Sequence, residues 1–286
     1  HNHPPMDLNS LPKELTDKQI EELNLMINTV AKRQLKDFGN IVSSTKSDGT
    51  LITECDRWSD ATIVQGLSEI APQEGVLSEE GCQTVPASSA YWVVDPLDGT
   101  TNFSAGIPYW AISIARFVEG KPETAILDIP ILQKRILAIH GKGVWLNGKP
   151  LSNQTRESSK TGCVSLCSRS IRILQKRPDK PFPGKIRLLG VSSLNMIGVA
   201  LGQTIAALEA TPKIWDLAAA WLILSELECS IKWLNLDPSE LEAGQDLTSI
   251  SFPVLTAGSN NELERLLPWG EILINSWTKI QDNIQQ

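Results

Sequence analysis

The sequence contains little histidine, and this limits the mechanisms that it can support. Only three histidines occur among 286 residues, and two of them, His1 and His3, stand at the start of the chain. A Ser-His-Asp triad, a phosphohistidine enzyme or a histidine-rich zinc hydrolase would therefore depend on His140 alone. Residues 135–140 have the pattern of a strand that ends before a Gly-Lys-Gly turn, so we expect His140 near the surface at a strand end. The shortage argues against all three mechanisms.

A surplus of basic residues, a long apolar run and paired cysteines are also missing. The 26 Lys and Arg against 33 Asp and Glu give a net charge of −7, which argues against nucleic-acid and membrane-surface partners. No apolar run approaches the roughly 20 residues of a membrane span, and residues 1–11 have no signal-peptide core, so we expect a cytoplasmic protein. The five cysteines are scattered without a CxxC motif, which predicts reduced thiols and no structural metal.

The hydrophobic residues, 41% of the chain, are enough for a sizeable core, and their spacing predicts an α/β fold. We divide the chain into a disordered segment 1–14, an α+β half 15–155 and an α/β half 156–286. Helical periodicity predicts helices at 16–38, 59–70, 194–201 and 215–227, the last apolar nearly all round and hence buried between layers. Alternating or continuous apolar runs predict strands at 91–94, 110–118, 124–129, 135–140, 163–168 and 205–209, with a hairpin at 144–148.

The most informative stretch is DPLDGTTNF, residues 95–103, which follows the apolar strand 91–94. Pro96 lacks an amide donor, so we expect the strand to end at Asp95, at the strand edge where open α/β sheets tend to bind ligands. Gly99 permits close approach of a ligand, and the amides of Gly99 and Thr100 can point at an anion. Asp95 and Asp98 offer the oxygen ligands that divalent cations prefer. The stretch therefore predicts metal-assisted chemistry on a phosphate.

Spacing argues against two other interpretations of this stretch. A haloacid-dehalogenase-type phosphatase needs one residue between its two aspartates, and here there are two; an EF-hand needs further oxygen ligands and a closing glutamate. An ordinary turn remains an alternative for an isolated D-x-x-D-G pattern. Elsewhere, Cys163 and Arg169 have the spacing of cysteine phosphatases, but the residues between them contain no glycine and alternate like a strand, which we favour.

Three further motifs decide between these interpretations. Taken in order, Thr53-x-x-Asp56, Ser78-Glu79-Glu80, DPLDGTTNF and Trp215-Asp216-Leu217-Ala218-Ala219 resemble the inositol monophosphatase family. This family is part of a lithium-sensitive, magnesium-dependent phosphatase superfamily that includes fructose-1,6-bisphosphatases. The resemblance covers about residues 15–268. It implies a layered α-β-α-β-α sandwich of the sugar phosphatase type, two or three Mg²⁺ ions, inhibition by Li⁺ and a homodimer.

The resemblance also implies the metal ligands. Glu79, Asp95 and the carbonyl of Leu97 would hold one magnesium ion, and Asp95, Asp98 and Asp216 a second. Asp95 would bridge the two ions. Two cations facing one phosphate neutralise its oxygens, lower the pKa of a bound water and stabilise the departing alkoxide. Asp216 also stands where a helix begins, so N-capping is a second role for it.

Catalytic roles are carried over in the same way. Glu79 and Thr100 would orient or activate the attacking water, and Asp56 would support Thr100 through a hydrogen bond. The amides of Gly99 and Thr100 would hold the phosphate oxygens. Because neighbouring residues of an extended segment point in opposite directions, we expect Glu80 to lie behind the site or on the surface.

The substrate is less well defined. The TTNF ending favours inositol monophosphate or a similar small sugar or polyol phosphate. Glu209 matches an acidic residue that contacts inositol hydroxyls in the family, although a surface carboxylate at a strand end is an equal alternative. Val191 and Ser192 lie where the family has substrate contacts, and Val191 replaces a hydroxyl. Alternatives are fructose-1,6-bisphosphate, histidinol phosphate, a nucleotide 3'-phosphate, or a non-catalytic binding module, which the intact ligand set argues against.

Overall fold

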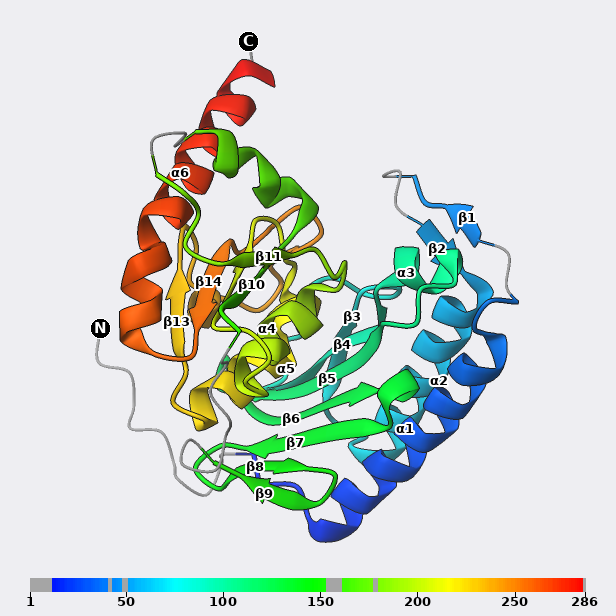
Figure 1. Cartoon of the computed structure of the whole chain (residues 1–286). Helices are drawn as coiled ribbons and strands as arrows, with labels where there is room; N and C mark the ends of the chain where they lie inside the picture. The colour runs from blue at the N-terminus through cyan, green and yellow to red at the C-terminus, as the bar shows by residue number, and fades with distance from the viewer. Residues whose placement is uncertain (1–11, 41–42, 48–50, 153–160, 177–179, 285–286) are drawn as a thin grey trace.

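The computed structural model describes residues 12–40, 43–47, 51–152, 161–176 and 180–284, and these form five layers (Figure 1). Helices α1 and α2 cover one face of a seven-stranded sheet, and α4 and α5 cover its other face. Beyond α4 and α5 lies a five-stranded sheet, whose outer face is covered by α6. The layered α-β-α-β-α sandwich expected from the sequence is thus confirmed. Most of the segment 1–14 lies outside the described residues.

The seven-stranded sheet has the order β3-β4-β5-β6-β7-β8-β9, with β3 parallel to β4 and all other pairs antiparallel. On β4, Trp92 and Val94 face α1 and α2, whereas Tyr91 and Val93 face α5, which explains its uninterrupted apolar run. The hairpin turn between β8 and β9 is Asn147-Gly148, both with positive φ, as its sequence predicts. The strands are Gly75–Ser78, Ala90–Asp98, Ala111–Val118, Lys121–Ile129, Lys134–Ile139, Gly143–Leu146 and Lys149–Leu151.

Two capping boxes begin the outer helices. Helix α1, Asp17–Asp37, starts after Thr16, whose hydroxyl accepts from Gln19 N at 3.1 Å. Helix α2, Glu54–Ile70, begins five residues before the predicted start, because Thr53 and Asp56 cap each other. Thr53-x-x-Asp56 is therefore the N-terminal cap of α2, a structural role that the family resemblance alone does not indicate. Short strands β1, Ser43–Thr45, and β2, Leu51–Thr53, form a hairpin before α2.

The central layer consists of α4, Ser192–Ala200, and α5, Ile214–Glu226. Nine of the 13 residues of α5 are buried, in line with the prediction from its apolar sequence, and three consecutive alanines, 218–220, lie within the largest core cluster. This cluster joins residues of both sheets to α4 and α5. The two halves of the sequence, divided near residue 155, therefore share this core, and their division into separate domains stays a prediction.

The five-stranded sheet has the order β11-β10-β12-β14-β13, in which β10 runs parallel to both β11 and β12. Its strands are Lys185–Arg187, Cys163–Leu166, Ala206–Glu209, Val254–Ala257 and Ser230–Trp233. The 3₁₀ helix η3, Ser168–Gln175, follows β10, and α6, Asn260–Ile284, packs on the outer face. Short helices η2, Pro130–Leu132, and η4, Pro238–Glu240, and the six-residue α3, Thr100–Ala105, complete the list.

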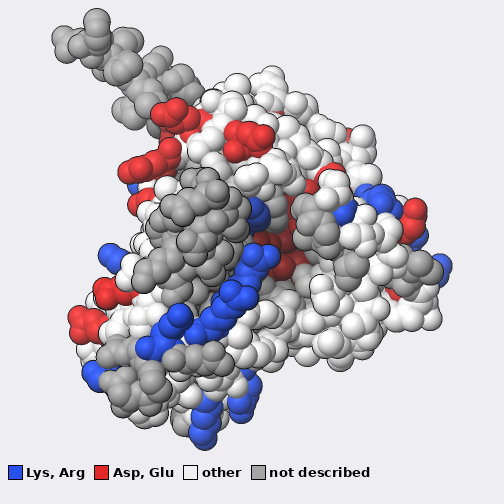
Figure 2. Space-filling view, turned by 90° about the horizontal axis from the view of Figure 1, so that it is seen from above, with Lys and Arg blue, Asp and Glu red and all other residues white. Residues whose placement is uncertain are grey.

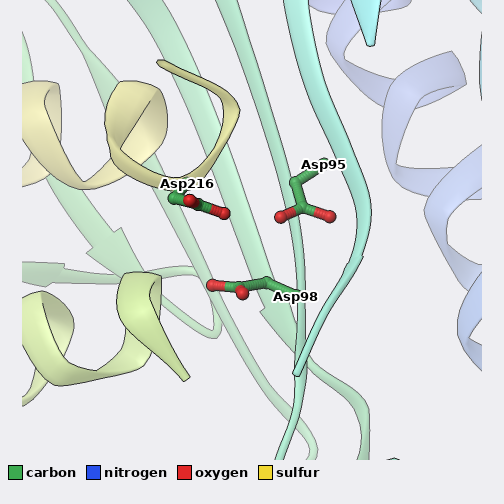
Figure 3. A group of neighbouring side chains, drawn as sticks. All are labelled: Asp95, Asp98 and Asp216. Atoms are coloured by element: carbon green, nitrogen blue, oxygen red, sulfur yellow. The ribbon is translucent and has the colours of Figure 1, made fainter. Parts of the chain in front are cut away.

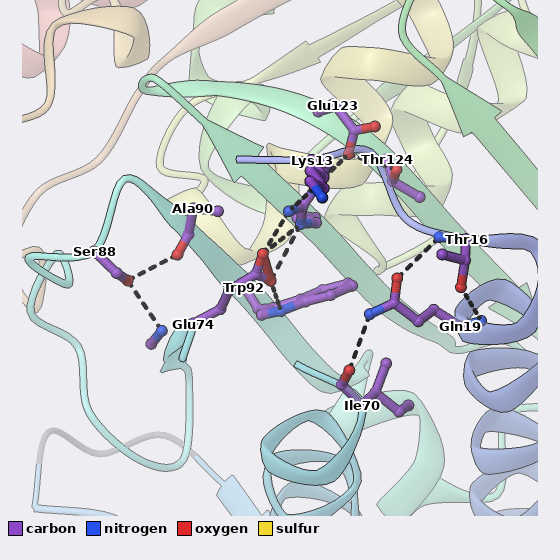
Figure 4. Close-up of polar contacts among 12 residues, drawn as sticks. Lys13, Thr16, Gln19, Ile70, Glu74, Ser88, Ala90, Trp92, Glu123 and Thr124 are labelled. Atoms are coloured by element: carbon purple, nitrogen blue, oxygen red, sulfur yellow. Dashed lines mark hydrogen bonds and ion pairs between the residues drawn. The ribbon is translucent and has the colours of Figure 1, made fainter. Parts of the chain in front are cut away.

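A buried arginine fixes the chain before α1 to the seven-stranded sheet. Arg116 on β5 is 3% exposed and pairs with Glu74 and Glu123, and its guanidinium donates to the carbonyl of Lys13 at 3.0 Å. Glu74 also accepts from Trp92 Nε1 at 2.9 Å, within the network of Figure 4. Because every charge in this network has a partner, we assign it a structural role.

Several other expectations from the sequence are settled by the fold. Residues 163–166 form β10, so their amides belong to a strand ladder and cannot surround a phosphate at Cys163. All five cysteines are free thiols. His140 follows β7 and is exposed, as expected. Among the helices of the described residues, none combines the length and apolar character needed to cross a membrane.

Candidate active site

The motif DPLDGTTNF lies where β4 leaves the seven-stranded sheet. The expectation that the strand ends before Pro96 is wrong, because β4 continues to Asp98. Asp95 pairs with Ser113, and Asp98 pairs with Ala111. Between these two pairs β4 advances by three residues and β5 by two, so β4 has one extra residue, which forms a bulge. A bulge removes one residue from the ladder, which is how a sheet accommodates a proline without an amide donor. It also turns two aspartates of one strand towards the same place.

A buried glutamine holds this bulge from the α1 side. Gln34 has no exposed surface, and its amide donates to Pro96 O at 2.8 Å. Its carbonyl accepts from Trp110 Nε1 at 2.9 Å. Trp110 in turn packs edge-on against Phe103, the last residue of the motif, with ring centroids 5.1 Å apart. The backbone that carries the aspartates is therefore fixed by hydrogen bonds and aromatic packing.

Three aspartates converge in front of this bulge. Asp95 and Asp98 come from β4 and Asp216 from the first turn of α5, and Figure 3 shows their carboxylates pointing towards one another. One oxygen atom of each lies within 4.8 Å of the others. Asp216 Oδ2 accepts from Lys213 N at 2.8 Å, so the capping interaction and the position at the cluster coexist. The sequence interpretation that brought residues 95, 98 and 216 together agrees with this arrangement.

Burial and mutual repulsion make this group electrostatically costly without a cation. Burial is the main cause that raises the pKa of Asp98 to about 7, and the charge of Asp216 adds to it. The pKa of Asp95 is raised well above its ordinary value, first by burial and then by the charges of Glu79 and Asp98. Asp95 Oδ2 is buried and has no hydrogen-bond donor among the described residues. Convergent carboxylate oxygens with an unsatisfied acceptor fit a hard divalent cation such as Mg²⁺.

Glu79 adjoins this cluster from the end of β3. Burial, together with the charges of Asp216 and Glu80, raises the pKa of Glu79 to about 8. Lys46, which follows β1, lies 3.9 Å from Glu79 Oε1 and 2.6 Å from Glu80 Oε1. The side chain of Glu80 is 5% exposed. Of the two positions expected for it, behind the site or on the surface, the first is therefore correct. Lys46 gave no signal in the sequence, because its partners are more than thirty residues away.

Thr100 and Asp56 are joined as the resemblance implies. Thr100 Oγ1 donates to Asp56 Oδ1 at 2.8 Å and lies 3.4 Å from Leu97 O. Asp56 has no exposed surface, and its other oxygen accepts from Thr53 N at 2.9 Å. Burial raises the pKa of Asp56, while its hydrogen bonds with Thr53 and Thr100 act in the opposite direction. Both carboxylate oxygens of Asp56 therefore have fixed partners.

Gly99 lies in the left-handed region, with a φ of +102°, between β4 and α3. A Cβ atom at this position would come within 2.9 Å of Val191 Cγ2. Val191 itself has no exposed surface and belongs to the largest core cluster. Its side chain thus packs behind Gly99, and the structure gives no support to a substrate contact through it.

Glu209, at the end of β12, is buried and held by α4. Its carboxylate accepts from Ser192 Oγ at 2.8 Å and from Asn195 Nδ2 at 2.6 Å. Burial raises its pKa to about 8, and the surface-carboxylate interpretation is therefore wrong. Ser193 N, on the same helix, donates to Asp98 Oδ2 at 2.8 Å. The signal for Asn195 in the sequence is its position three residues after Ser192, which places both on one helix face.

The raised pKa values predict how stability depends on pH. The carboxyl of Glu79 titrates near 8 in the folded chain against 4.5 ordinarily, and that of Asp98 near 7 against 3.8. Between these values the folded chain binds more protons than the unfolded chain, so the free energy of unfolding of metal-free protein falls as pH rises. A cation binds the ionised carboxylates and thereby restores the free energy of unfolding that is lost as pH rises. We expect the rise in Tm caused by Mg²⁺, relative to EDTA, to be larger at pH 8 than at pH 5. A rise that is equal at both pH values would contradict this expectation.

The chain is similar to known proteins over most of its length. The model of the inositol monophosphatase family matches residues 13–276. An inositol-1-monophosphatase of Rhizobium meliloti is 30% identical over 218 residues, 71% of this chain and 82% of the relative. A Nus factor SuhB of Pseudomonas aeruginosa is 31% identical over 225 residues, 74% and 78% of the two chains. A histidinol-phosphatase of Mycobacterium tuberculosis is 32% identical over 192 residues, 64% and 74% of the two chains.

Solved structures share the fold. An IMPase of Thermotoga maritima superimposes with a TM-score of 0.75 at 22% identity and covers 90% of this chain and 99% of its own. An IMPase/NADP phosphatase complexed with Mg²⁺ and phosphate has a TM-score of 0.71 at 24% identity, with 87% and 95% covered. A Staphylococcal inositol monophosphatase in a LiCl-soaked inhibitory complex has a TM-score of 0.71 at 23% identity, with 89% and 95% covered.

Proposed function

The chain belongs to the inositol monophosphatase family, whose members hydrolyse phosphate monoesters, and on this premise we propose a magnesium-dependent phosphomonoesterase for small sugar or polyol phosphates. Inositol monophosphate is the first candidate substrate. The observation that carries the proposal is the convergence of Asp95, Asp98 and Asp216 around a buried, unsatisfied oxygen of Asp95. Bound Mg²⁺ would supply charge neutralisation at the phosphate and a lowered pKa for water.

The residues that would hold the metal ions come from β4, from the first turn of α5 and from the position after β3. Asp95, Asp98 and Asp216 would form the central set, and Glu79 and the carbonyl of Leu97 would extend it. Relatives with the same fold have been described with Mg²⁺ and with Li⁺, which supports both metal dependence and lithium inhibition here. The number of ions, two or three, is an expectation from the family resemblance.

The chain's own groups would position water and phosphate. Because the Thr100 hydroxyl donates its proton to Asp56, its oxygen lone pairs remain available to accept a hydrogen bond from the attacking water. Glu79, whose carboxyl bonds that of Asp95, would orient or activate that water, as the family resemblance implies. The amides of Gly99, the residue before α3, and of Thr100, its first residue, would bind the phosphate oxygens.

Glu209 would select the alcohol part of the substrate. Its two hydrogen bonds to α4 place a carboxylate beside the aspartates, since Ser192 bonds Glu209 and the adjacent Ser193 bonds Asp98. An acceptor in this place suits the hydroxyls of a sugar or polyol. Because Val191 is buried in place of a family hydroxyl, Ser192 is the polar contact that the substrate would meet on this segment.

The enzymatic alternatives use the same site on fructose-1,6-bisphosphate, histidinol phosphate or a nucleotide 3'-phosphate. A non-catalytic module on this fold is the second alternative. The complete set of carboxylates argues against it, since a site without activity has no reason to retain several buried charges that repel each other. A cytoplasmic location and a homodimer stay predictions.

Phosphate release from a panel of esters, with Mg²⁺ and with or without Li⁺, tests the proposal. We expect magnesium-dependent release from small sugar or polyol phosphates and its suppression by Li⁺. Release from none of the esters would exclude the enzymatic proposal. Preference for a bisphosphate over inositol 1-phosphate would exclude inositol specificity and leave the chemistry intact.

A further inference from the structure

The buried face of helix α1 carries a polar side chain in an apolar row. The helix buries Leu23, Ile27, Val30, Ala31 and Gln34, and of these five only Gln34 is polar. Gln34 has no exposed surface, and burial of an amide costs free energy unless its polar atoms are hydrogen-bonded. Its polar atoms must therefore find their partners inside the protein.

The side-chain amide of Gln34 joins α1 to three other parts of the fold. Its Nε2 donates to Pro96 O on β4 at 2.8 Å and to Ser59 Oγ on α2 at 3.0 Å. Its Oε1 accepts from Trp110 Nε1, just before β5, at 2.9 Å. Because an indole nitrogen is only a donor, the carbonyl of Gln34 must face Trp110 and its NH₂ group must face Pro96. The direction of the amide is therefore fixed.

The backbone group that Gln34 binds is also bound to Asp95. The carbonyl of Pro96 and the N–H of Leu97 belong to one peptide unit. The carbonyl accepts from Gln34, and the N–H donates to Asp95 Oδ1 at 3.2 Å. A trans peptide unit is planar, and its C=O and N–H point in opposite directions. A rotation that displaces the carbonyl must also displace the N–H, so Gln34 fixes the donor that orients the carboxylate of Asp95.

This peptide unit connects two sides of β4. Figure 3 shows the carboxylates of Asp95 and Asp98 on one side of the strand and blue helices of the N-terminal part on the other. Figure 2 shows a recess on the upper face in which acidic side chains are exposed. Gln34 has no exposed surface, so its influence on a bound ion must pass through the backbone that it holds.

We propose that Gln34 is a positioning residue for the metal site, which acts on bound Mg²⁺ through the Pro96–Leu97 peptide unit and Asp95. The inference rests on the proposed function, in which Asp95 bridges two ions, and adds a residue from outside the motifs found in the sequence. A carboxylate shared by two ions must present its oxygens in fixed directions. Groups that orient metal ligands in this way typically change metal affinity or activity by about 10- to 100-fold when they are mutated.

The test measures Mg²⁺ binding to the full chain without substrate, by calorimetry and by the rise of Tm with Mg²⁺ concentration. Gln34→Met keeps the approximate length of the side chain and removes its hydrogen bonds. We expect the Kd for Mg²⁺ to rise about tenfold or more. In steady-state kinetics the Mg²⁺ concentration for half-maximal rate should rise with it. At saturating Mg²⁺ the KM for the ester should change less than about twofold, since Gln34 has no exposed surface.

Control variants separate this effect from a loss of stability. Ile27→Ala removes a buried side chain from the same face of α1, two turns before Gln34. It should lower Tm and leave the Kd for Mg²⁺ within about twofold of the wild type. Trp110→Phe removes the donor to Gln34 Oε1 and keeps the bond to Pro96, so its Kd should rise less than that of Gln34→Met. If Gln34→Met does not fold, Gln34→Ala replaces it, because water can satisfy the buried groups without being tied to α1.

An unchanged Kd in the Gln34 variant, or an equal rise in Ile27→Ala, would overturn the inference and leave Gln34 a structural role. A larger rise in Trp110→Phe than in Gln34→Met would also overturn it, because the effect would then come from aromatic packing. These results leave the phosphatase proposal standing, since hydrolysis by the wild type is measured in the same buffer. A wild-type chain that binds no Mg²⁺ would overturn the proposed function and this inference together.

Discussion

Replacing Asp98 by asparagine is expected to lower metal-dependent turnover by more than about 100-fold while the fold is retained. Mutation of residues that only support metal ligands lowers metal affinity or activity by about 10- to 100-fold. Removal of the charge of a ligand itself should lower activity by more. The fold should persist because Asn Oδ1 can still accept from Ser193 N, the partner of Asp98 at 2.8 Å. Steady-state kinetics at several Mg²⁺ concentrations would measure the loss.

Stability distinguishes this outcome from simple unfolding. Burial raises the pKa of Asp98 to about 7, so its ionised form destabilises the metal-free protein above that pH. Metal-free Asp98→Asn should therefore melt at or above the wild-type Tm at pH 8 and should gain little from Mg²⁺. Asp128→Asn is a matched control, because Asp128 is also buried but pairs with Arg135 at 2.8 Å. That control should lose stability and keep its turnover; near-normal turnover of Asp98→Asn would remove Asp98 from the metal site.

The sequence indicated individual helices and strands through their apolar patterns, and it indicated the layers and the metal-binding carboxylates through its resemblance to a family. Continuous apolar runs identified β4 and α5, and four ordered motifs identified Asp95, Asp98 and Asp216 as partners. The bulge at Pro96 could not be predicted, since proline ends most strands and only pairing with β5 shows that the ladder resumes. The burial of Glu209 was equally hidden, because it depends on Ser192 and Asn195 from another element.

Helix α6 shows why tertiary packing overrides local preference. The sequence patterns predict no helix there, and Pro268 lies inside it, which would cost about 3 kcal/mol in an isolated helix. Leu266, Trp269 and Leu273 are buried against the outer face of the five-stranded sheet. Burial of such side chains contributes about 1.5–3 kcal/mol each, enough to offset the proline.

Replacing Thr100 by alanine is expected to lower kcat by roughly 100- to 10,000-fold, the range for loss of a group that positions a proton in the transition state. The hydroxyl donates to Asp56 at 2.8 Å, which leaves its oxygen to hold the attacking water. Thr100→Ser keeps the hydroxyl and should retain most of the rate. Since the Thr100 side chain holds no metal in this scheme, the Tm increase caused by Mg²⁺ should be unchanged in both variants, unlike in Asp98→Asn.

A double variant tests whether Asp56 acts only through this hydroxyl. Asp56 has no exposed surface, and its other carboxylate oxygen accepts a hydrogen bond at the cap of α2. It therefore cannot contact the substrate while it orients Thr100. Asp56→Ala should therefore lower kcat in the wild type but cost little further in a Thr100→Ala background, because effects through one shared contact are not additive. Its loss of helix capping, about 1 kcal/mol, should lower Tm equally in both backgrounds. A full further loss of kcat in the double variant would show that Asp56 reaches the reaction by a route independent of Thr100.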